Sequence, residues 1–276
     1  MTAPFERGLY RGVDDRVYHA DPALSSSGAR TIAMRSPRDF WEDRHNGRPP
    51  NRDLDFGHAA HRYLLGTGSE LEIVEADSWR SDAAKAARDA AYAAGRVPLL
   101  PEEDEQAQQM AAVVLQHPLA GPLFAEGEAE LSGWWPDPET GVMLRFRADW
   151  MRRIKGRLVI VDYKTSKYTG LSGFNKSLGE FGYFMQQPFY IEGARVLDLD
   201  PDPDFIFVSQ CKTPPYRVTV ARLEREDIAL GQALNRYAIR RFADCLAADD
   251  WPDDSDQIHT AALPRWARYQ AEEILS

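Results

Sequence analysis

The sequence contains few cysteines, and their placement excludes two kinds of metal centre. Its 276 residues include only Cys211 and Cys245, which lie far apart and form no Cys-x-x-Cys pair. A zinc ribbon needs closely spaced pairs of thiolate ligands, and an iron–sulfur cluster of the common kind needs four cysteines. This chain alone can supply neither centre, and we expect it to work in a reducing cytoplasm, where free thiols persist.

Long apolar runs and repeats are also missing. No stretch of about 18 apolar residues suggests a membrane span, and no charged-then-apolar leader suggests a signal peptide. Neither an internal repeat nor a low-complexity linker is present. With 43% hydrophobic residues, the chain can bury a sizeable core. We expect a single domain over residues 1–276, with a mainly helical part (20–125), a catalytic sheet core (126–222), and a C-terminal helix with an acidic tail (223–276).

The charge of the chain is unevenly distributed. A net charge of −10 disfavours a polyanionic partner, because nonspecific affinity for nucleic acids comes from Lys and Arg side chains that neutralise phosphates. Residues 145–176, however, hold nine basic residues and two acids, a net charge of +7 that leaves −17 for the rest of the chain. The two acids are Asp149 and Asp162. This segment is typical of a site for a metal-bridged phosphate, and an ordinary solvated charged surface is the alternative.

Asp162 and Lys164 stand at the end of a buried strand. They follow the apolar run 158–161, which is typical of a strand covered on both faces, where charged groups are costly unless they are used. Alternate residues share a face, so Asp162 and Lys164 project together while Tyr163 offers the site only its backbone carbonyl. With Asp149 from the preceding strand, two carboxylates can hold one or two hard divalent cations. A structural Asp–Lys ion pair is the alternative.

Hydrophobic periodicity and turn residues predict the remaining elements. Ser25 or Ser27 is expected either to cap a helix or to contact a DNA phosphate. We expect helices over Ala29–His45 (broken at Ser36-Pro37), Gly57–Leu65, Ser81–Gly95, Pro101–His117, Leu178–Leu197 and Glu224–Ala247. We expect strands over Glu128–Trp135, Val142–Met151, Leu158–Thr165, Asp204–Cys211 and Tyr216–Ala221, and a loop over Tyr168–Ser177.

Three predicted elements carry further polar candidates. His61 lies on an apolar helix face, where it is either a core residue or a ligand, and the paired histidines of a metalloprotease helix are absent. Gln186 and Tyr190 are four residues apart and share a helix face. Glu130 lies on the first arm of the hairpin and points either toward the acids or toward solvent.

Five short motifs occur in a characteristic order. They are Leu24-Ser25-Ser26-Ser27, Gly57-x-x-x-His61, Arg147-Ala148-Asp149, Asp162-Tyr163-Lys164-Thr165 and Gln186-x-x-x-Tyr190. Together they resemble the exodeoxyribonuclease VIII (RecE-type) and lambda-exonuclease-like nucleases of the PD-(D/E)XK superfamily, over roughly residues 20–200. One departure is Ala148, where the family usually has a proline. That proline shapes the backbone and binds no metal, so we expect activity to survive its absence.

The resemblance implies a restriction-endonuclease-like fold of the α/β (α+β) class, a mixed sheet flanked by helices, and it implies roles for the residues. Lys164 would orient the attacking water and offset developing charge, and Gln186 would support the lysine or contact substrate. One or two Mg²⁺ or Mn²⁺ ions would be bound by Asp149, Asp162, the carbonyl of Tyr163 and His61 as a ligand or neighbour, with Glu130 as a further acid. The residues expected to contact substrate are Ser25, Ser27, Arg145, Arg147, Thr165, Lys167 and Tyr190.

The resemblance also implies an activity. Such enzymes degrade one strand of linear double-stranded DNA from its 5′ end, leave 3′ single strands for a RecT-like annealing protein, and in several cases form rings. We therefore expect a phage or prophage exonuclease in the bacterial cytoplasm. A site-specific or structure-specific endonuclease of the same fold and a catalytically inactive DNA-binding module are the alternatives. The iron–sulfur CRISPR-associated exonucleases share some of these motifs, but two cysteines cannot hold their cluster.

Overall fold

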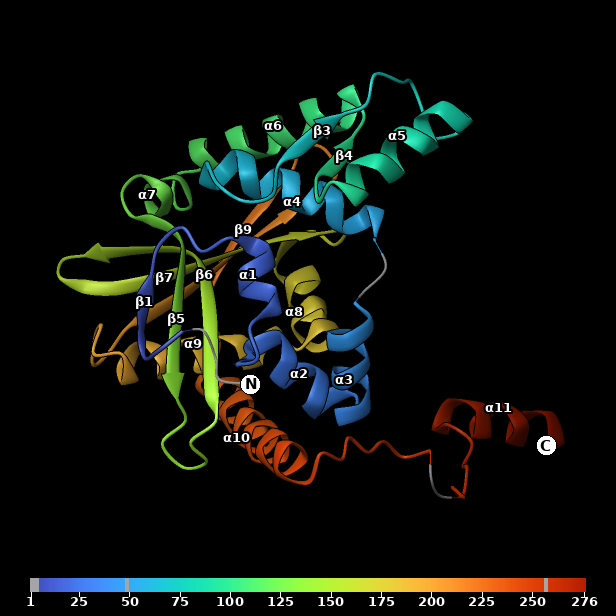
Figure 1. The fold of residues 1–276 in the computed structure, drawn as a ribbon. Helices are drawn as coiled ribbons and strands as arrows, with labels where there is room; N and C mark the ends of the chain where they lie inside the picture. The colour runs from blue at the N-terminus through green and yellow to red at the C-terminus, as the bar shows by residue number, and fades with distance from the viewer. Residues whose placement is uncertain (1–4, 48–49, 256–257) are drawn as a thin grey trace.

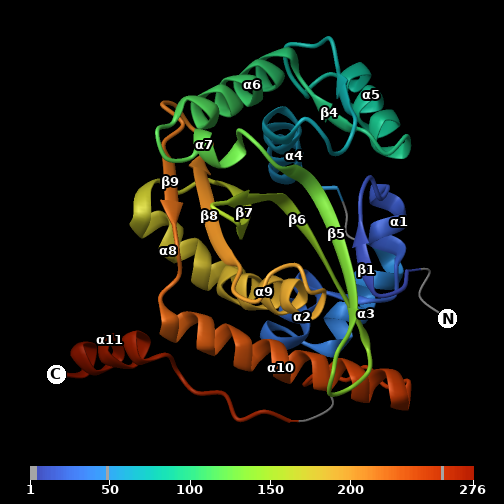
Figure 2. The same ribbon diagram turned by 90° about the vertical axis from the view of Figure 1, so that its left-hand side faces the viewer.

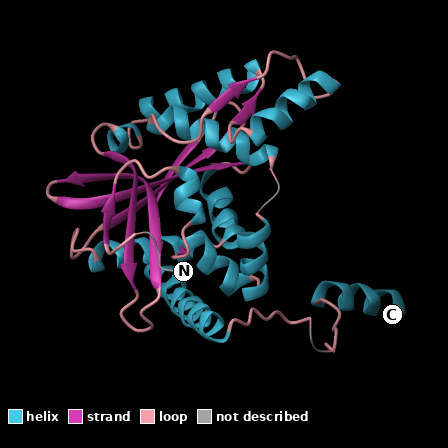
Figure 3. Cartoon of the chain, in the orientation of Figure 1, coloured by secondary structure: helices cyan, strands magenta, loops and turns pink. Residues whose placement is uncertain are grey.

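A mixed β-sheet lies between two layers of helices. The computed structural model describes residues 5–47, 50–255 and 258–276, and within them the central sheet has seven strands in the order β1-β5-β6-β7-β8-β9, with β2 beside β6. These strands are β1 (Gly8–Tyr10), β2 (Leu24–Ser25), β5 (Glu128–Pro136), β6 (Met143–Ile154), β7 (Arg157–Ser166), β8 (Asp204–Cys211) and β9 (Val218–Ala221). The predicted α/β class and mixed sheet are confirmed (Figures 1 and 3).

Helices cover both faces of this sheet. They are α1 (Asp15–Ala20), α2 (Ser26–Met34), α3 (Pro37–Asn46), α4 (Arg52–Leu65), α5 (Asp82–Ala93), α6 (Pro101–Gln116), α7 (Gly121–Phe124), α8 (Gly170–Phe181), α9 (Gln186–Val196), α10 (Arg225–Ala248) and α11 (Arg265–Leu275), with the short 3₁₀ helix η1 (Tyr183–Met185). A small parallel pair, β3 (Leu71–Ile73) and β4 (Val97–Leu99), lies between α4 and α5. Among the described residues, no helix is both long and apolar enough to span a bilayer.

The core divides into one cluster on each side of the sheet. On one side, α2, α9 and α10 pack apolar side chains such as Ile32, Phe189 and Phe242 against β5, β6, β7 and β8. On the other side, α4 and α6 contribute Leu64, Met110 and neighbouring residues. Figure 2 shows the strands of the sheet spread from β9 to β1 between these layers, with α4 and α6 above and α9 and α10 below. Burial of this apolar surface is the main force that holds the layers together.

Strand β7 is central because it pairs in two directions. It is antiparallel to β6 and parallel to β8, and the connection from β7 to β8 runs through α8, η1 and α9. The side chains of Leu158 and Ile160 enter the α9–α10 layer, whereas Val159, Val161 and Tyr163 enter the α4–α6 layer. Strand alternation therefore directs Asp162 toward the α9–α10 layer.

In the neighbouring strands β5 and β6, the regular alternation of side chains between the two faces of the sheet is interrupted at one level. In β6, Ala148 packs in the α9–α10 layer but Trp150, two residues on, packs in the α4–α6 layer. In β5, Leu131 and Ala129 differ in the same way, and Glu130 between them adopts a φ of 50°. Because Ala129 pairs with Trp150 and Leu131 with Ala148, both strands break their alternation at the same level. The sheet is therefore locally twisted where Asp149 occurs.

The structure corrects two predictions between residues 168 and 197. The segment predicted as a loop over Tyr168–Ser177 is mostly helix α8, and the single helix predicted over Leu178–Leu197 is broken into α8, η1 and α9. The break is at Gly182, which ends α8 in the left-handed conformation with a φ of 63°, a role for which glycine is favoured. Gly173 suggested a loop, but its missing side chain lets α8 approach Tyr168, since an added Cβ would lie 2.7 Å from that residue's Cβ.

Most of the other long elements confirm the predictions. Helices α5, α6 and α10, the β5–β6 hairpin and strands β7 and β8 lie within a few residues of their predicted bounds, and Ser36 caps α3 at the predicted break. Ser25 caps α2 by accepting the N–H of Gly28 at 3.1 Å, which confirms the capping interpretation. The elements missed are short or lack a buried face, namely β1, α1, β2, β3, β4, α7 and α11, which has no buried residue.

Helix α10 crosses η1 at a glycine, which gives the first prediction. A Cβ on Gly231 would lie 2.3 Å from the carbonyl oxygen of Phe184, and that backbone cannot retreat without moving η1. Gly231→Ala is expected to lower the free energy of unfolding by about 1–3 kcal/mol through overpacking. Gly179→Ala in α8 is the matched control, because nothing lies within 4 Å of its added Cβ. It should gain about 0.5–1 kcal/mol. Urea unfolding checks both, and equal midpoints for the two variants would contradict the packing argument.

Candidate metal centre between strands β6 and β7

The site lies where β6 and β7 separate. Their antiparallel pairing runs from Ile154 opposite Arg157 to Trp150 opposite Val161 and then stops. One residue further, a carboxylate oxygen of Asp149 accepts the backbone N–H of Tyr163 at 2.8 Å. The side chain thus takes the place of the neighbouring strand and satisfies a buried backbone donor. Beyond this point β7 pairs only with β8, so β6 and β7 diverge beside Asp149.

Asp162 is buried close to the point where the strands diverge, and its carboxylate has two polar partners. Its carboxylate is 1% exposed, and the Lys164 ammonium lies 2.7 Å from Oδ1 and 2.6 Å from Oδ2. The side-chain amide of Gln186, the first residue of α9, donates to Oδ1 at 2.5 Å. The structure thus brings together Asp149, Asp162, Lys164 and Gln186, which the sequence placed on three separate elements.

The electrostatics of this group are dominated by burial. Burial raises the pKa of Asp162 to about 6, against the opposing influence of Lys164. Burial likewise raises the pKa of Asp149 above its ordinary value. Burial alone would lower the pKa of Lys164, but the two carboxylates raise it above its usual value and keep the ammonium charged. One ammonium therefore does not fully compensate two buried acids, and a further cation would stabilise them.

His61 borders the same group from α4. Its Nδ1 lies 3.9 Å from Oδ2 of Asp149, and its ring rests on Tyr163 with the centroids 4.9 Å apart. Burial lowers the pKa of His61 to about 4, so the ring is neutral at pH 7. A neutral imidazole is the form that binds metals.

The donor set fits a hard divalent cation. Among the side-chain atoms that the structure describes, Oδ2 of Asp162 and Oε1 of Gln186 are buried without a hydrogen bond, although Oδ2 is in ionic contact with Lys164. No group of three acidic, histidine or cysteine side chains is close enough to form a ready-made metal cage in the described parts of the chain. Asp149 and Asp162 would therefore hold the ion with water or backbone oxygens, such as the carbonyl of Tyr163, and with His61 adjacent. Such open coordination is usual for Mg²⁺.

Glu130 borders the site on the far side of Asp149. Burial raises the pKa of its carboxyl, and Asp15 and Asp149 act in the same direction. Its Oε1 faces the loop after α4, where a Cβ on Gly68 would lie 3.3 Å away. Glu130 thus occupies the position across from Asp149 that the sequence indicated, and its catalytic role stays a prediction.

Two predicted substrate contacts, Arg145 and Tyr190, are buried and bind internal partners. Arg145 is 4% exposed and binds the carboxylate of Asp21 at 3.3 Å and the carbonyl of Ala23 at 2.7 Å. Tyr190 is 7% exposed, and its hydroxyl donates to the carbonyl of Arg147 at 2.8 Å. Arg145 thus fixes the segment after α1 to β6, and Tyr190 fixes α9 to the same strand, because a buried donor needs an internal acceptor.

The basic segment as a whole is more neutralised than its sequence suggests. Arg147 ion-pairs with Asp15 and also donates to the hydroxyl of Ser132 at 3.0 Å. Three more arginines bind internal acceptors: Arg152 the carbonyl of Pro122, Arg153 that of Leu199, and Arg157 the carboxylate of Asp202. Among the described residues, the basic side chains of this segment that form no ion pair and no bond to a carbonyl are Lys155, Lys167 and Lys176. The +7 segment is therefore no continuous positive surface.

The remaining predicted substrate contacts are Thr165, Lys167 and Ser27. Thr165 follows Lys164 on β7, and its hydroxyl lies close to α4, since a Cβ on Gly57 would be 3.1 Å from it. Lys167 is exposed directly after the strand. Ser27 is exposed and within 3.0 Å of Ser25 through its hydroxyl. Their contact with a substrate stays a prediction.

Sequence reasoning missed Tyr183. The Nζ of Lys164 lies 5.1 Å from the centroid of its ring. Tyr183 sits within an apolar stretch, where an aromatic residue is usually part of the core, and only the break at Gly182 turns it toward the site. The glycine before it was the one available signal.

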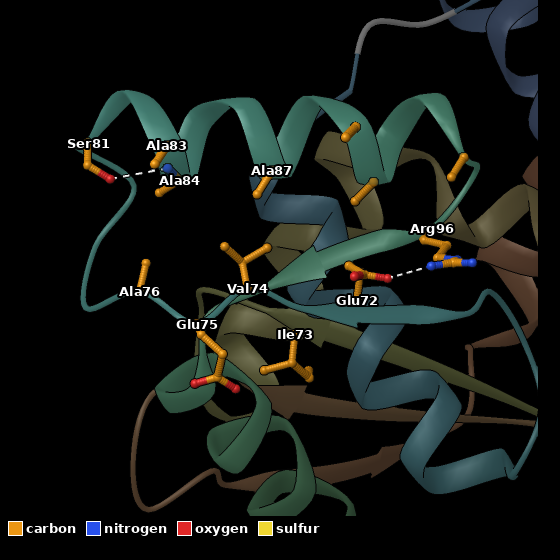
Figure 4. Close-up of a pocket in the computed structure, with 13 residues that line it drawn as sticks. Glu72, Ile73, Val74, Glu75, Ala76, Ser81, Ala83, Ala84, Ala87 and Arg96 are labelled. Carbon is orange, nitrogen blue, oxygen red and sulfur yellow. Dashed lines mark hydrogen bonds and ion pairs between the residues drawn. The ribbon is translucent and has the colours of Figure 1, made fainter.

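A hollow elsewhere on the surface does not belong to this centre. It lies between α5 and the β3–β4 pair and is lined largely by alanines such as Ala84 and Ala87 (Figure 4). At its edge Glu72 and Arg96 form an ion pair at 2.7 Å. None of the residues of the metal centre lines it.

The sequence matches, over residues 25–264, the family described as a PDDEXK-like domain of unknown function (DUF3799). The chain belongs to this family. No curated protein matches the sequence. Among solved structures, a crystal structure described as a "Putative exonuclease" from Eubacterium rectale is similar with a TM-score of 0.61 and 12% identity, over 92% of this chain and 94% of that one. That similarity confirms the fold, and the family supports a nuclease of the PD-(D/E)XK superfamily without singling out its RecE-type branch.

Metal binding gives a direct test of this centre. Asp149→Asn and Asp162→Asn each remove one anionic ligand and should weaken Mn²⁺ binding, measured by titration calorimetry, by at least about 10-fold. Glu139→Gln is the control, because this exposed carboxylate pairs with Arg240 at 2.5 Å in the β5–β6 loop. If both aspartate variants bind Mn²⁺ as tightly as Glu139→Gln, the proposed centre is wrong.

Proposed function

We propose that this protein is a divalent-metal-dependent exodeoxyribonuclease that degrades linear double-stranded DNA, in the 5′ to 3′ direction. The observation that carries the proposal is the meeting of Asp149, Asp162 and Lys164 at the point where β6 and β7 separate. Family membership supports the nuclease class. Mg²⁺ is the expected ion, with Mn²⁺ as a substitute.

The residues would divide the work of phosphodiester hydrolysis. Asp149 and Asp162 would bind the cation, which when present would polarise the phosphate and favour ionisation of a bound water. The Tyr163 N–H fixes the orientation of Asp149, and Gln186 fixes that of Asp162. The Lys164 ammonium would hold the attacking water and offset negative charge as it develops on the phosphate.

A short platform beside the site would bind the DNA backbone. Two ammonium groups lie against one ring there: Nζ of Lys167 is 5.1 Å and Nζ of Lys176 4.4 Å from the ring centroid of Tyr168. Two hydrogen bonds fix Tyr168 in place. Its backbone N–H donates to the hydroxyl of Ser166 at 3.0 Å, and the Tyr168 hydroxyl donates to the carboxylate of Glu180 at 3.1 Å. Lys167 follows Lys164 by only three residues. If one phosphate of the DNA strand lies near Lys164, the next phosphate would therefore lie near Lys167.

This platform predicts a change in salt dependence. Lys167→Gln combined with Lys176→Gln should reduce the slope of log K against log salt concentration by about 1.4–1.8, because each lost phosphate contact contributes about 0.7–0.9. Lys155→Gln is the matched control from the same segment, since Lys155 lies in the β6–β7 turn at the other end of the strand. Fluorescence anisotropy with labelled DNA at several salt concentrations measures both. Equal slopes for the double variant and the control would contradict the platform.

Cleavage assays test the function itself. Linear duplexes labelled at the 5′ or the 3′ end, and a closed circular duplex, are incubated with Mg²⁺ or EDTA. We expect Mg²⁺-dependent release from the 5′ label, a long 3′ strand and an intact circle. Asp149→Asn, Asp162→Asn and Lys164→Ala should each lower the rate by orders of magnitude while DNA affinity changes little, and Glu139→Gln should retain full activity.

The other outcomes separate the alternatives. A cut circle would indicate an endonuclease, and binding without cleavage in any metal would indicate an inactive DNA-binding module. Full activity in all three site variants would refute the site. As part of the same proposal, the 3′ strand would pass to a RecT-like annealing protein, and several copies would form a ring around the duplex.

A further inference from the structure

The catalytic lysine has a neighbour that the proposed chemistry does not use. Nζ of Lys164 is bracketed by the Asp162 carboxylate, 2.6 Å away, and by the ring of Tyr183, whose centroid is 5.1 Å away. A distance below about 6 Å allows a cation–π attraction, which is stronger when the cation is desolvated. The side chain of Lys164 is only 18% exposed, so the contact is a sheltered one.

Tyr183 is held in place from two helices. Arg30 of α2 donates to the carbonyl of Phe181 at 3.0 Å, and its guanidinium carbon lies 5.5 Å from the Tyr183 ring. Gly182 packs against the same helix, because an added Cβ would lie 2.3 Å from the sulfur of Met34. From the other direction, the side-chain amide of Asn235 in α10 donates to the carbonyl of Met185 at 2.8 Å. The turn that carries Tyr183 is therefore fixed on both sides.

The same turn reaches both members of the buried ion pair. Tyr183 contacts Lys164, and Gln186, three residues later, donates to Asp162. A lysine has a long flexible stem, and a carboxylate that also binds a cation is a weak anchor for it. An aromatic face attracts the ammonium without adding a negative charge that would compete for the metal.

We propose that Tyr183 is a positioning residue that confines the Lys164 ammonium beside the metal centre, and that its ring rather than its hydroxyl does so. The expected effect of Tyr183 on kcat rests on the proposed nuclease function. The placement of Lys164 against the ring is a property of the folded protein alone. The two can therefore be tested separately.

The catalytic test compares variants that keep or remove the ring. Tyr183→Phe should retain kcat within about 3-fold, whereas Tyr183→Leu should lower kcat by about 10- to 30-fold, the size expected for a sheltered cation–π contact. KM for linear DNA and affinity for Mn²⁺ should stay unchanged in both. Phe181→Leu is the matched control, because this exposed aromatic lies in the same turn with its ring 5.5 Å from Tyr183. It should retain wild-type kcat.

Two outcomes would overturn the proposal. If Tyr183→Phe loses as much kcat as Tyr183→Leu, the hydroxyl is what matters. If Tyr183→Leu keeps its kcat, the ring does not position the lysine. A fall in kcat accompanied by a matching rise in KM or loss of metal affinity would indicate general damage to the site instead, and would also count against it.

A readout independent of cleavage separates this proposal from the function. The ε-methylene protons of a lysine held against an aromatic ring are shifted upfield in a ¹H–¹³C spectrum. The resonance that disappears in Lys164→Met should be shifted in the wild type and in Tyr183→Phe and should return to its ordinary position in Tyr183→Leu. If these shifts occur but no substrate is cleaved, the positioning stands and the nuclease proposal falls. An unshifted Lys164 resonance in the wild type would refute the positioning.

Discussion

One hydrogen bond determines the form of the site: the Asp149 carboxylate accepts the N–H of Tyr163 at 2.8 Å where β6 and β7 stop pairing. An unpaired N–H in the middle of a buried sheet would be costly. A side-chain acceptor removes that cost and lets two strands diverge without leaving a gap in the ladder. The same hydrogen bond places an acid where the strands diverge, so the residue that allows the divergence is also the first of the two proposed metal ligands. The break in alternation at Glu130 and Asp149 is the backbone counterpart of this exchange.

The second acid is stabilised differently, by the connection from β7 to β8. A parallel strand pair requires a crossover, and here the crossover brings η1 and the start of α9 back across the face from which Asp162 and Lys164 project. Gln186 then reaches Asp162, and Tyr183 reaches Lys164. Removing one partner of a buried ion pair is strongly destabilising, and the crossover supplies a further contact to each member of this pair. Asp149 and Asp162 together nevertheless carry more buried negative charge than the Lys164 ammonium balances, and a cation can neutralise the excess.

The parts of the site that could be predicted from the sequence are those specified locally. Asp162 and Lys164 follow from an apolar strand that ends in charges at alternate positions, and Asp149 from its place on the adjoining arm of a hairpin. Helices α5, α6 and α10 are likewise specified by patterns within their own segments, such as the Ser81 cap of α5 and the acids in the first turn of α6. The break at Gly182 packs against Met34 of α2, which is distant in sequence, and the start of α8 depends on the close packing of Gly173 on Tyr168. No periodicity within the segment could reveal them, and Tyr183 was missed as a result.

The net charge of segment 145–176 does not by itself show which of its basic side chains are available to a ligand. The basic segment was expected to face a phosphate backbone, yet Arg145, Arg147 and Arg157 are bound to Asp21, Asp15 and Asp202, acids that lie outside that segment. A guanidinium presents several donors in a fixed plane and therefore suits internal pairing with carboxylates and carbonyls. The lysines of the same segment behave differently: Lys164 enters the site, and Lys167 and Lys176 stay exposed on Tyr168. A lysine ammonium is compact, strongly hydrated and mobile, which suits exchange between water and phosphate. In this segment, arginines therefore stabilise the fold, whereas Lys167 and Lys176 stay available to a ligand. The net charge of the segment does not make this distinction.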